Sequence, residues 1–472
     1  MQEDRQHLIL EVLREATRGS EYENRLWLVG GYVRDKALGK PSAKDDIDIV
    51  LEGDALALAR LLHERGATQN APVIYPRFGT AMVRVLGGDV ELVTARKESY
   101  GEGSRKPAEV KPATLEEDAR RRDFTINTLL ENLHTKEIRD PLGSAFPDLD
   151  AGVIRTPTQP FLTFKDDPLR MLRAVRFAVR LAFRIEPETK KAIKKSAERL
   201  RPPTVSLERI RDEFSKILMA DKPAKGLELL RETRLLAQFA PELLEMEGVT
   251  QNEFHAYPVW EHTLVALDSL VQSEPHAPLL LRLAVLFHDI GKPRTRSEGP
   301  DGRVHFYHHE DTGAEMAREI LTRLKFSKAD VDAVAQMVEQ HMRIGEYKPA
   351  QWTDAAVRRF VRASGPHRED LFAIHRADVA ALAAGHQDTS RAQNLRERIE
   401  RLQEQHDSEA IVSPLSGSEI MALLALPAGP KVGEVKDYLT NEVIEGKLAP
   451  GDKVAAERLA KEFAAGHAAS AK

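Results

Sequence analysis

The fold of the first domain is decided by the stretch Leu28-Val29-Gly30-Gly31-Tyr32-Val33-Arg34-Asp35, which Asp46-Ile47-Asp48 follows. A glycine pair closes an apolar segment, and two aspartates sit two residues apart in a second short apolar segment. Because alternate residues of a strand share a face, Asp46 and Asp48 point the same way. Two carboxylates this close favour a divalent cation, and hard cations such as Mg²⁺ take carboxylate and phosphate oxygens. The pattern therefore predicts a magnesium site beside a phosphate.

The glycine pair and the arginine predict the phosphate-binding part of the same site. Gly30 and Gly31 let backbone N–H groups approach a phosphate, and Arg34 can hold another phosphate oxygen. A glycine pair alone is usually a turn, and a lone pair of alternating aspartates is usually a solvated loop. Their order on a strand–turn–helix–strand pattern favours nucleotidyl transfer, in which a hydroxyl attacks a nucleoside triphosphate.

Composition excludes several classes of protein. The 472 residues are too many for one core and predict about three domains. No cysteine is present, which excludes disulfides and thiolate metal sites. The polar start, without an apolar leader or membrane span, predicts a cytoplasmic protein. Net charge is −5, but residues 164–216 carry 15 Lys or Arg against 8 Asp or Glu, which suits either a phosphate-binding face or a solvated helix surface.

Periodicity divides the chain into four parts. Alternating strand and helix patterns predict a mixed α/β domain over residues 1–143, followed by a helical body over 144–253. A histidine-bearing helical domain is expected over 254–385, and a helical tail over 386–472. Within the first part we expect helices at 1–24, 31–38 and 56–65, strands at 26–29 and 46–51, and a hairpin of 81–86 with 90–94.

Five ordered motifs resemble the class II tRNA nucleotidyltransferase and bacterial poly(A) polymerase family. They are Gly30-Gly31-x-x-Arg34-Asp35, the Asp46 and Asp48 pair, Arg121-Arg122-Asp123-Phe124-Thr125-Ile126-Asn127, Asp140-Pro141-Leu142-Gly143, and Asp167-Pro168-Leu169-Arg170 continuing through Arg173 to Phe177. The resemblance implies an α/β nucleotidyltransferase head with a small mixed sheet, then a mostly helical neck and body. It also implies tRNA, CTP and ATP as partners and Mg²⁺ as the cofactor.

The third motif is expected to serve the nucleotide. Arg121 and Arg122 can fork onto phosphate or ribose, and Asn127 can orient the ribose hydroxyls. For Asp123, contact with the ligand and a role as a helix N-cap are equally good interpretations.

The fifth motif is expected to read the base. On one helix, Asp167 and Arg170 would share a face, so that a carboxylate and a guanidinium meet the amino group and ring acceptor common to cytosine and adenine. An intrahelical ion pair is the simpler alternative. Arg173 and Arg176 continue the stripe toward the triphosphate or the tRNA backbone. Asp166 stands where the family commonly has Glu, which affects the tuning of specificity.

Two further segments fit the family less specifically. Residues 97–107 read as a polar, glycine-rich loop, where the family has a flexible loop associated with the switch from C to A addition. Its presence favours a complete enzyme over one that adds only CC. Glu208, Arg209 and Glu213 resemble the last neck motif, or else form an ordinary set of helix charges.

The second half carries a set of metal-ligating residues that resembles the HD phosphohydrolase domain, over about residues 254–380. Imidazole and carboxylate without thiolate suit Mn²⁺, Fe²⁺, Co²⁺, Ni²⁺ or Mg²⁺. The context of His308 and His309 favours His309 as the ligand. The expected ligands are His262, His288, Asp289, His309, His341 and Asp378.

The expected protein is therefore an enzyme that adds CCA to tRNA from CTP and ATP, with an HD phosphatase or phosphodiesterase domain. An enzyme that adds only CC or only A, or a poly(A) polymerase, is the main alternative. An HD hydrolase whose first half only binds RNA is the second, and an HD domain serving only as tRNA-binding scaffold is also open.

Overall fold

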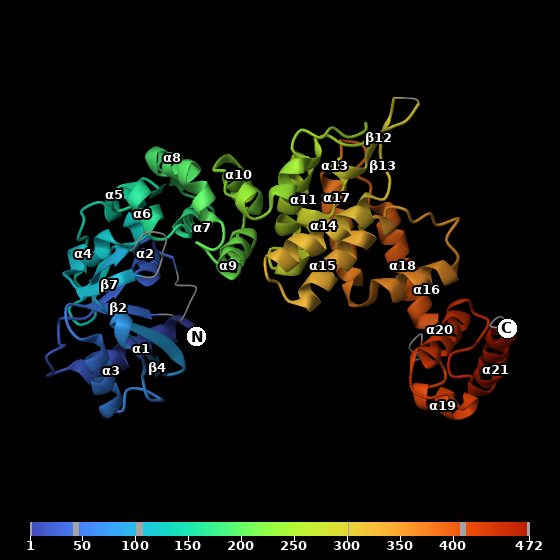
Figure 1. The fold of residues 1–472 in the computed structure, drawn as a ribbon, viewed down its shortest axis with the longest axis horizontal. Helices are drawn as coiled ribbons and strands as arrows, with labels where there is room; N and C mark the ends of the chain where they lie inside the picture. The colour runs from blue at the N-terminus through green and yellow to red at the C-terminus, as the bar shows by residue number, and fades with distance from the viewer. Residues whose placement is uncertain (1, 41–46, 101–106, 301, 406–411, 470–472) are drawn as a thin grey trace. The chain divides into compact units, whose positions relative to one another are not determined.

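A computed structural model describes residues 2–40, 47–100, 107–300, 302–405 and 412–469 of the chain. These residues form two compact units, one of residues 1–244 with 323–326 and the other of 245–322 with 327–472 (Figure 1). Among the described residues, no helix has the length and apolar character needed to cross a bilayer. The three predicted domain boundaries, after residues 143, 253 and 385, stay predictions.

A seven-stranded mixed sheet forms the centre of the first unit, in the order β3-β4-β5-β2-β1-β8-β9. Only β2 and β5 run parallel, and every other neighbouring pair is antiparallel. This arrangement confirms the predicted small mixed sheet. The strands are β1 (Trp27–Val29), β2 (Ile47–Leu51), β3 (Val73–Tyr75), β4 (Thr80–Val85), β5 (Gly88–Thr94), β8 (Leu130–Asn132) and β9 (Ile138–Arg139).

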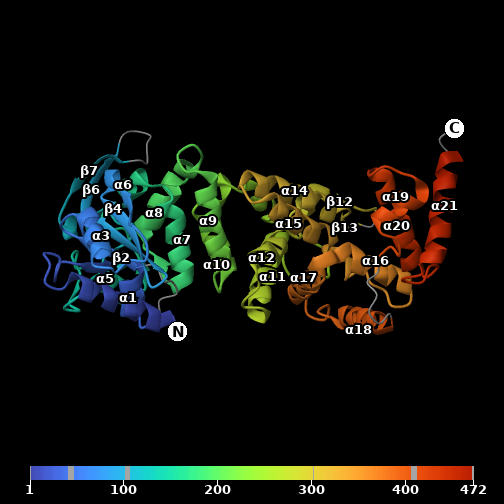
Figure 2. The same ribbon diagram turned by 90° about the horizontal axis from the view of Figure 1, so that it is seen from below.

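Apolar side chains on these strands explain why the sheet forms. β1 is buried along its whole length, and β2 is buried except at Asp48. The helix α3 (Ala55–Glu64) covers β4 and β5 with Leu58 and Leu62, and Asp54 caps its first turn. The helices α1 (Gln2–Thr17), labelled in Figure 2, and α2 (Gly31–Ala37) complete the predicted order. The helix ends lie within a few residues of those expected, except that α1 ends at Thr17.

The segment predicted as a glycine-rich loop differs from expectation. β6 (Arg96–Tyr100) and β7 (Pro107–Pro112) pair as an antiparallel ribbon, while residues 101–106 lie outside the described part. Lys97 pairs with Lys111 across this ribbon. Polar composition pointed to a loop, but a ribbon exposed to solvent also tolerates polar side chains on both faces.

Helices make up the rest of the first unit. The helix α7 packs against α9 and α10, and its Phe177 ring meets Phe124 edge-on at 5.8 Å. The helix α7 lies near the ends of β1 and β2. The elements are α4 (Leu115–Arg120), η2 (Thr125–Asn127), α5 (Ala145–Asp150), α6 (Pro160–Asp166), α7 (Arg170–Leu181), α8 (Pro187–Ser196), α9 (Leu207–Leu218) and α10 (Pro223–Glu232), with the short strands β10 (Val153–Ile154) and β11 (Arg184–Ile185).

The expectation that Asp167 and Arg170 share one helix is wrong. α6 ends at Asp166, and Asp167 is extended, with φ −141° and ψ 101°. The residue before a proline avoids the helical region because the proline ring crowds its backbone, and Pro168 follows directly. Arg170 begins the next helix, α7, so the two side chains come from different elements.

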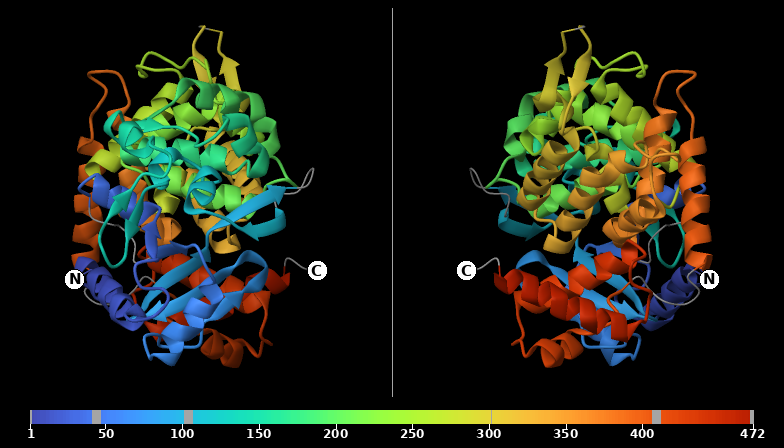
Figure 3. Two further views of the ribbon diagram at one scale, coloured as in Figure 1. Left: turned by 90° about the vertical axis from the view of Figure 1, so that its left-hand side faces the viewer. Right: turned by 90° about the vertical axis from the view of Figure 1, so that its right-hand side faces the viewer.

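The second unit is mostly helical. Its central helix α12 is buried at every residue from Leu281 to Phe287, and α11, α15 and α17 pack around it. A hairpin of β12 (Arg296–Glu298) and β13 (Val304–Phe306) extends from these helices, although an all-helical domain was expected (Figure 3). The helices are α11 (Val259–Ser273), α12 (Leu279–Phe287), α13 (Lys292–Thr295), α14 (His309–Arg323), α15 (Lys328–Gln340), η6 (His341–Arg343), α16 (Asp354–Ser364), α17 (Arg368–Ala380) and α18 (Ser390–Gln405).

The end of the chain has a small core of its own. Leu415, Ile420, Leu439 and other buried side chains form a cluster among α19 (Gly417–Leu424), α20 (Pro430–Ile444) and α21 (Lys453–Ala469). Tyr438 stacks on Phe463 there, with ring centres 4.4 Å apart.

Candidate active sites

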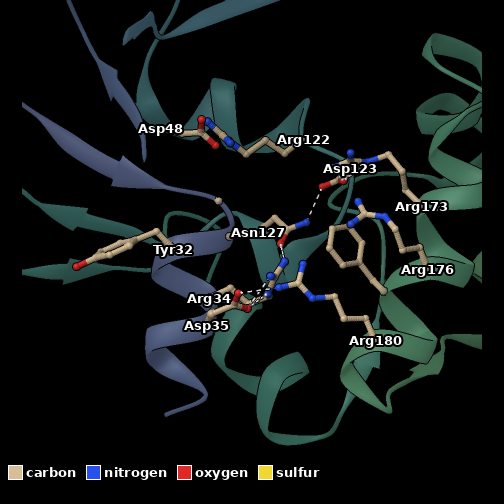
Figure 4. A pocket seen from close by; sticks show the side chains of 13 residues that line it. Tyr32, Arg34, Asp35, Asp48, Arg122, Asp123, Asn127, Arg173, Arg176 and Arg180 are labelled. Carbon is tan, nitrogen blue, oxygen red and sulfur yellow. Dashed lines mark hydrogen bonds and ion pairs between the residues drawn. The ribbon is translucent and has the colours of Figure 1, made fainter. Parts of the chain in front are cut away.

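A pocket of about 270 Å³ lies in the first unit, where β1, β2, η2 and α7 meet (Figure 4). It brings together nine of the residues predicted to act in the first half. They are Gly30, Gly31, Arg34, Asp48, Arg122, Asp123, Asn127, Arg173 and Arg176. Arg121, Asp167 and Arg170 do not line it, and Asp46 lies outside the described residues.

The turn at Gly30 lies against the carboxylate of Asp48. Gly30 has a φ of +77°, which favours glycine, and a Cβ placed there would lie 3.3 Å from Oδ2 of Asp48. Val29, the last residue of β1, is paired with Asp48 on β2. The turn predicted to bind phosphate and the carboxylate predicted to bind a metal are therefore adjacent, because the two strands are adjacent.

A third carboxylate, which the sequence reasoning missed, stands beside Asp48. Glu91 on β5 is in register with Asp48 on the parallel strand β2, so both side chains share one face of the sheet. Burial raises the pKa of Glu91, and the nearby Asp48 raises it further. Asp48 and Glu91 are thus two close carboxylates, and a divalent cation between them would relieve the repulsion that disfavours ionisation of Glu91. No local pattern marks Glu91, because its role depends on the pairing of β2 with β5.

Arg121 and Arg122 both fork onto one buried carboxylate. Arg121 donates from Nε and Nη2 to Oδ1 of Asp118 at 3.0 and 2.5 Å, and Arg122 donates to Oδ2 at 3.2 and 2.9 Å. Burial alone would raise the pKa of Asp118, but Arg122 and Arg121 outweigh it and hold the pKa below its usual value. Asp118 thus orients Arg122, whose side chain lines the pocket and extends toward Asp48 (Figure 4).

Arg34 supports the pocket from beneath. Its side chain is 2% exposed and donates to Oδ1 of Asp35 at 2.7 Å and to Oδ1 of Asn127 at 2.8 Å. Asn127 in turn donates to Oδ1 of Asp123 at 2.9 Å. Arg34 and Asn127 were predicted to bind phosphate and ribose, and in this structure both are engaged with protein groups.

Asp123 carries this network onto α7. Arg173 donates to Oδ2 of Asp123 at 2.8 and 2.5 Å. Burial by itself raises the pKa of Asp123, but Arg173 and Asn127 outweigh burial and hold the pKa well below its usual value. Asp123 also accepts from the N–H of Phe124 at 2.8 Å, and the N-cap of η2 is Phe124, not Asp123. Asp123 is therefore a bridge between elements more than a helix cap.

One face of α7 is lined with cations. Arg173, Arg176 and Arg180 recur at helical spacing around Phe177, and all four line the pocket. Arg176 lies 4.3 Å from the centre of the Phe177 ring and donates to Glu213 at 2.6 Å, while Arg180 meets Asp35 at 3.3 Å. Arg180 and Phe177 were missed, although their spacing of seven and four residues from Arg173 could have identified them.

Asp167 has a different partner from the one expected. Arg209 on α9 donates to Oδ2 of Asp167 at 2.8 Å and to Oδ1 at 3.4 Å. Asp167 also accepts from the N–H of Leu169 at 3.1 Å, which fixes it at the start of α7. Arg170 donates its backbone N–H to the carbonyl oxygen of Asp167 at 3.1 Å, and within the described part of the chain its side chain makes no hydrogen bond or ion pair.

The six predicted histidine and aspartate ligands of the second unit meet in two groups. His262, His288 and Asp378 form one, and Asp289, His309 and His341 form the other, with the ligand atoms of each group within 4.8 Å of one another. Asp289 joins the groups. Its Oδ2 lies 3.2 Å from Nε2 of His288, and its Oδ1 lies 3.5 Å from Nε2 of His309.

Backbone contacts aim three of the imidazoles inward. Nδ1 of His288, His309 and His341 lies 2.7, 2.8 and 2.6 Å from a carbonyl oxygen three residues earlier, so Nε2 faces the centre. Nε2 of His288 is buried and, among the described residues, has no hydrogen-bond partner. Burial lowers the pKa of His341 to about 3, with further lowering by His288 and His309, so the imidazole is neutral and can bind a metal.

Close packing holds the second histidine group in place. A Cβ at Gly291 would lie 2.1 Å from the carbonyl oxygen of His309, so only glycine lets α14 begin this close to Asp289. His308, the neighbour of His309, is exposed and points to Asp311 at 3.3 Å. Lys292, which the sequence reasoning did not single out, donates to Oδ2 of Asp289 at 2.7 Å.

The donor sets fit the two kinds of metal expected. Carboxylates beside a glycine turn suit Mg²⁺, and a cluster of imidazoles and carboxylates suits a transition metal or Mg²⁺. A mixed sheet with this pocket defines a nucleotidyltransferase, and the second unit adds an HD metal centre.

Comparison with known families agrees with this class. The poly A polymerase head domain matches residues 26–155, the probable RNA and SrmB-binding site of polymerase A matches 182–246, and the HD domain matches 255–413. The chain belongs to the tRNA nucleotidyltransferase and poly(A) polymerase family and is a nucleotidyltransferase.

Its relatives include enzymes of different specificity. The A-adding tRNA nucleotidyltransferase of Deinococcus radiodurans is 41% identical over 69% of this chain and 74% of its own length. The CC-adding enzyme of Thermus thermophilus is 35% identical over 72% and 76%. The multifunctional CCA protein of Halorhodospira halophila is 33% identical over 66% and 72%.

The fold is also that of solved structures. The CCA-adding enzyme of Bacillus stearothermophilus, solved with CTP, superposes with a TM-score of 0.66 at 22% identity and covers 97% of both chains. The Thermotoga maritima CCA-adding enzyme, solved with tRNA, gives a TM-score of 0.56 at 21% identity over 98% of this chain and 95% of that one.

Proposed function

We propose that this chain completes tRNA 3′ ends by adding CCA from CTP and ATP. The observation that carries the proposal is the pocket in which Asp48, the turn at Gly30 and the arginines of α7 meet. Membership of the family supplies the RNA substrate, and the relatives include CCA-adding, CC-adding and A-adding enzymes.

We assign different roles to the residues of the pocket. Asp46 and Asp48 would hold Mg²⁺, with Glu91 beside Asp48, and the ion when bound would activate the attacking hydroxyl and neutralise charge on the triphosphate. The cations on α7 and Arg122 give the pocket the positive field that a triphosphate needs. Arg34 and Asn127 keep these groups in place.

The base is read outside the pocket wall. Asp167 accepts from the exocyclic amino group of cytosine or adenine, and Arg170 donates to the adjacent ring acceptor. Arg209 orients the Asp167 carboxylate from α9. Uracil and guanine present the reverse order of donor and acceptor and are rejected.

The test uses tRNA transcripts that end before CCA, after C and after CC, each incubated with one labelled nucleotide at a time. Two C additions followed by one A, all abolished by Asp48→Ala, are expected. A long A tail would instead identify a poly(A) polymerase. Absence of any incorporation would leave an RNA-binding first half and overturn the proposal.

A-only addition is the second candidate, because the A-adding relative is 41% identical to this chain. The same transcripts separate the two functions. An A-adding enzyme extends only the transcript that ends in CC, and only with ATP.

For the second unit we propose metal-dependent hydrolysis of a phosphomonoester or a 2′,3′-cyclic phosphate. The two ligand groups joined by Asp289 support a site for two ions, which are Mn²⁺, Fe²⁺, Co²⁺, Ni²⁺ or Mg²⁺. Lys292 beside Asp289 adds a positive charge for a phosphate oxygen.

Release of the 2′- or 3′-monophosphate from a 2′,3′-cyclic nucleotide, and of phosphate from a phosphomonoester, each measured with each metal, tests this hydrolysis. Release should persist in Asp48→Ala and vanish in Asp289→Ala. If no metal supports release by the wild type, the unit is a scaffold and the hydrolase proposal fails, while the transferase proposal stands.

A further inference from the structure

A second cavity, of about 420 Å³, opens in the second unit between the end of α15 and α16. Neither the transferase site nor the HD ligands use it, although Gln340 on its wall directly precedes the ligand His341. The side chains that give the cavity its chemistry are Gln340, Arg343, Glu346, Trp352, Arg359 and Phe360.

Gln340 offers an unused acceptor. Its Nε2 donates to the carbonyl oxygen of Ala363 at 3.1 Å, and Gln336 donates to the same oxygen at 2.9 Å. Exchanging the amide atoms of Gln340 would set two oxygens against each other, so these contacts fix its orientation. Its Oε1 is then buried and, among the described residues, has no hydrogen-bond partner. A ligand N–H would satisfy it.

Trp352 offers an aromatic surface that is already held in place. Its ring meets Tyr347 edge-on at 5.3 Å and Phe360 at 6.1 Å. The Trp352 side chain is half-buried, so part of it faces the cavity. A fixed indole stacks on a planar heterocycle with little loss of side-chain freedom.

Charged groups complete the lining. Arg343 is exposed, and within the described part of the chain neither Arg343 nor Glu346 makes a side-chain hydrogen bond or ion pair. Arg359 is oriented by an ion pair with Glu445, the residue that follows α20. Guanidinium groups bind phosphate, and a carboxylate accepts from ribose hydroxyls.

We propose that this cavity binds a single ribonucleotide. The base stacks on Trp352 and donates an N–H to Oε1 of Gln340, Glu346 accepts from the ribose, and Arg343 with Arg359 holds the phosphate. The ligand is either a free nucleotide or one unpaired residue of an RNA strand, which share this chemistry. The proposal does not depend on turnover at either catalytic site.

Titration of the full-length protein with AMP and with the RNA trinucleotide CCA, followed by tryptophan fluorescence, tests the proposal. A base that stacks on Trp352 should quench its fluorescence. Because Trp27 and Trp260 are buried, the change in fluorescence should come from Trp352, and Trp352→Phe should abolish it.

Arg343→Glu and Gln340→Leu should each weaken nucleotide binding at least tenfold. Lys328→Glu, a matched charge reversal at the other end of α15, should leave it unchanged. Ribose 5-phosphate and adenosine should each bind at least tenfold more weakly than AMP.

The two ligands distinguish the sources. Saturable quenching by AMP alone identifies a free nucleotide, and quenching only by the trinucleotide identifies an RNA residue. Absence of saturable quenching by both, or equal affinity in wild type, Arg343→Glu and Gln340→Leu, overturns the proposal. Circular dichroism of each variant establishes that the fold is retained.

Discussion

At the scale of single residues, the first site is built from side chains that support one another. Arg34, which the sequence motif predicts to bind phosphate, is buried and donates hydrogen bonds to Asp35 and Asn127. Glu91, which no motif marks, stands beside Asp48 on the neighbouring strand. The sequence motif thus predicts which residues lie near the site, whereas the contacts that each side chain makes depend on the fold.

Glu91→Gln should raise the stability of the metal-free protein at neutral pH. The folded pKa of Glu91 is raised, so its ionised form costs stability as pH rises above the ordinary glutamate pKa, and an amide removes that cost. The same change should weaken Mg²⁺ binding roughly tenfold if Glu91 supports the ion. Thermal unfolding with and without Mg²⁺ measures both effects. Asp89→Asn, on the same strand and exposed, is the control. An unchanged Mg²⁺ response would contradict the assignment.

Arg209→Met should loosen base selection. Without the ion pair at 2.8 Å, the Asp167 carboxylate loses its orientation, so kcat/KM for CTP and ATP should fall about tenfold and the preference over UTP and GTP should narrow. Single-nucleotide incorporation on the tRNA transcripts measures this change. Arg211→Met removes a neighbouring arginine of α9 that pairs with Asp212, and it should leave selection unchanged. Equal discrimination in both variants would remove Arg209 from base reading.

At the scale of elements, α7 joins the sheet to the helical body through its charged face. Arg173 binds Asp123 and Arg180 binds Asp35, so two bridges seven residues apart on one face hold the helix against the pocket. The helices and strands themselves could be predicted, because apolar periodicity determines them locally. The break at Asp167 was also encoded locally, in the following proline, whereas the pairing of β2 with β5 and of Asp167 with Arg209 depends on contacts distant in sequence.

Asp123→Asn should destabilise the first unit by about 1–3 kcal/mol at neutral pH, because Arg173 loses a charged partner that is itself almost fully buried. The folded pKa of Asp123 is lowered, so its contribution is present above the ordinary aspartate pKa and is lost as pH falls through the depressed value. The difference between variant and wild type should therefore shrink in acid. Urea unfolding at pH 7 and at about pH 3 measures it. A difference independent of pH would contradict the ion-pair explanation.

At the scale of the whole molecule, one chain carries two sites of different chemistry in two compact units. A carboxylate-based site favours Mg²⁺, whereas a cluster that includes imidazoles also accepts transition metals, so we expect the two sites to differ in their response to added ions. Each predicted set of site residues lies in one half of the sequence and so within one compact unit, and the roles of those residues stay predictions.

Removal of metal should therefore affect the units unequally. Chelation should lower the unfolding temperature of the second unit by about 5–10 °C, the loss expected when an ion present at about 100 times its Kd is withdrawn. Differential scanning calorimetry before and after chelation, and after Mn²⁺ or Ni²⁺ is restored, measures the shift. Asp289→Asn should show no response to chelation. A shift of the same size in that variant would place the stabilising ion elsewhere.

The position of Asp289 between the two histidine groups has a thermodynamic consequence. One carboxylate supplies an oxygen to each group, so whichever ion arrives first fixes the orientation that the other ion meets. Occupancy of one group and affinity of the other are then linked reciprocally. The second unit should accordingly load its ions as a coupled pair, with a binding isotherm that two independent sites cannot describe.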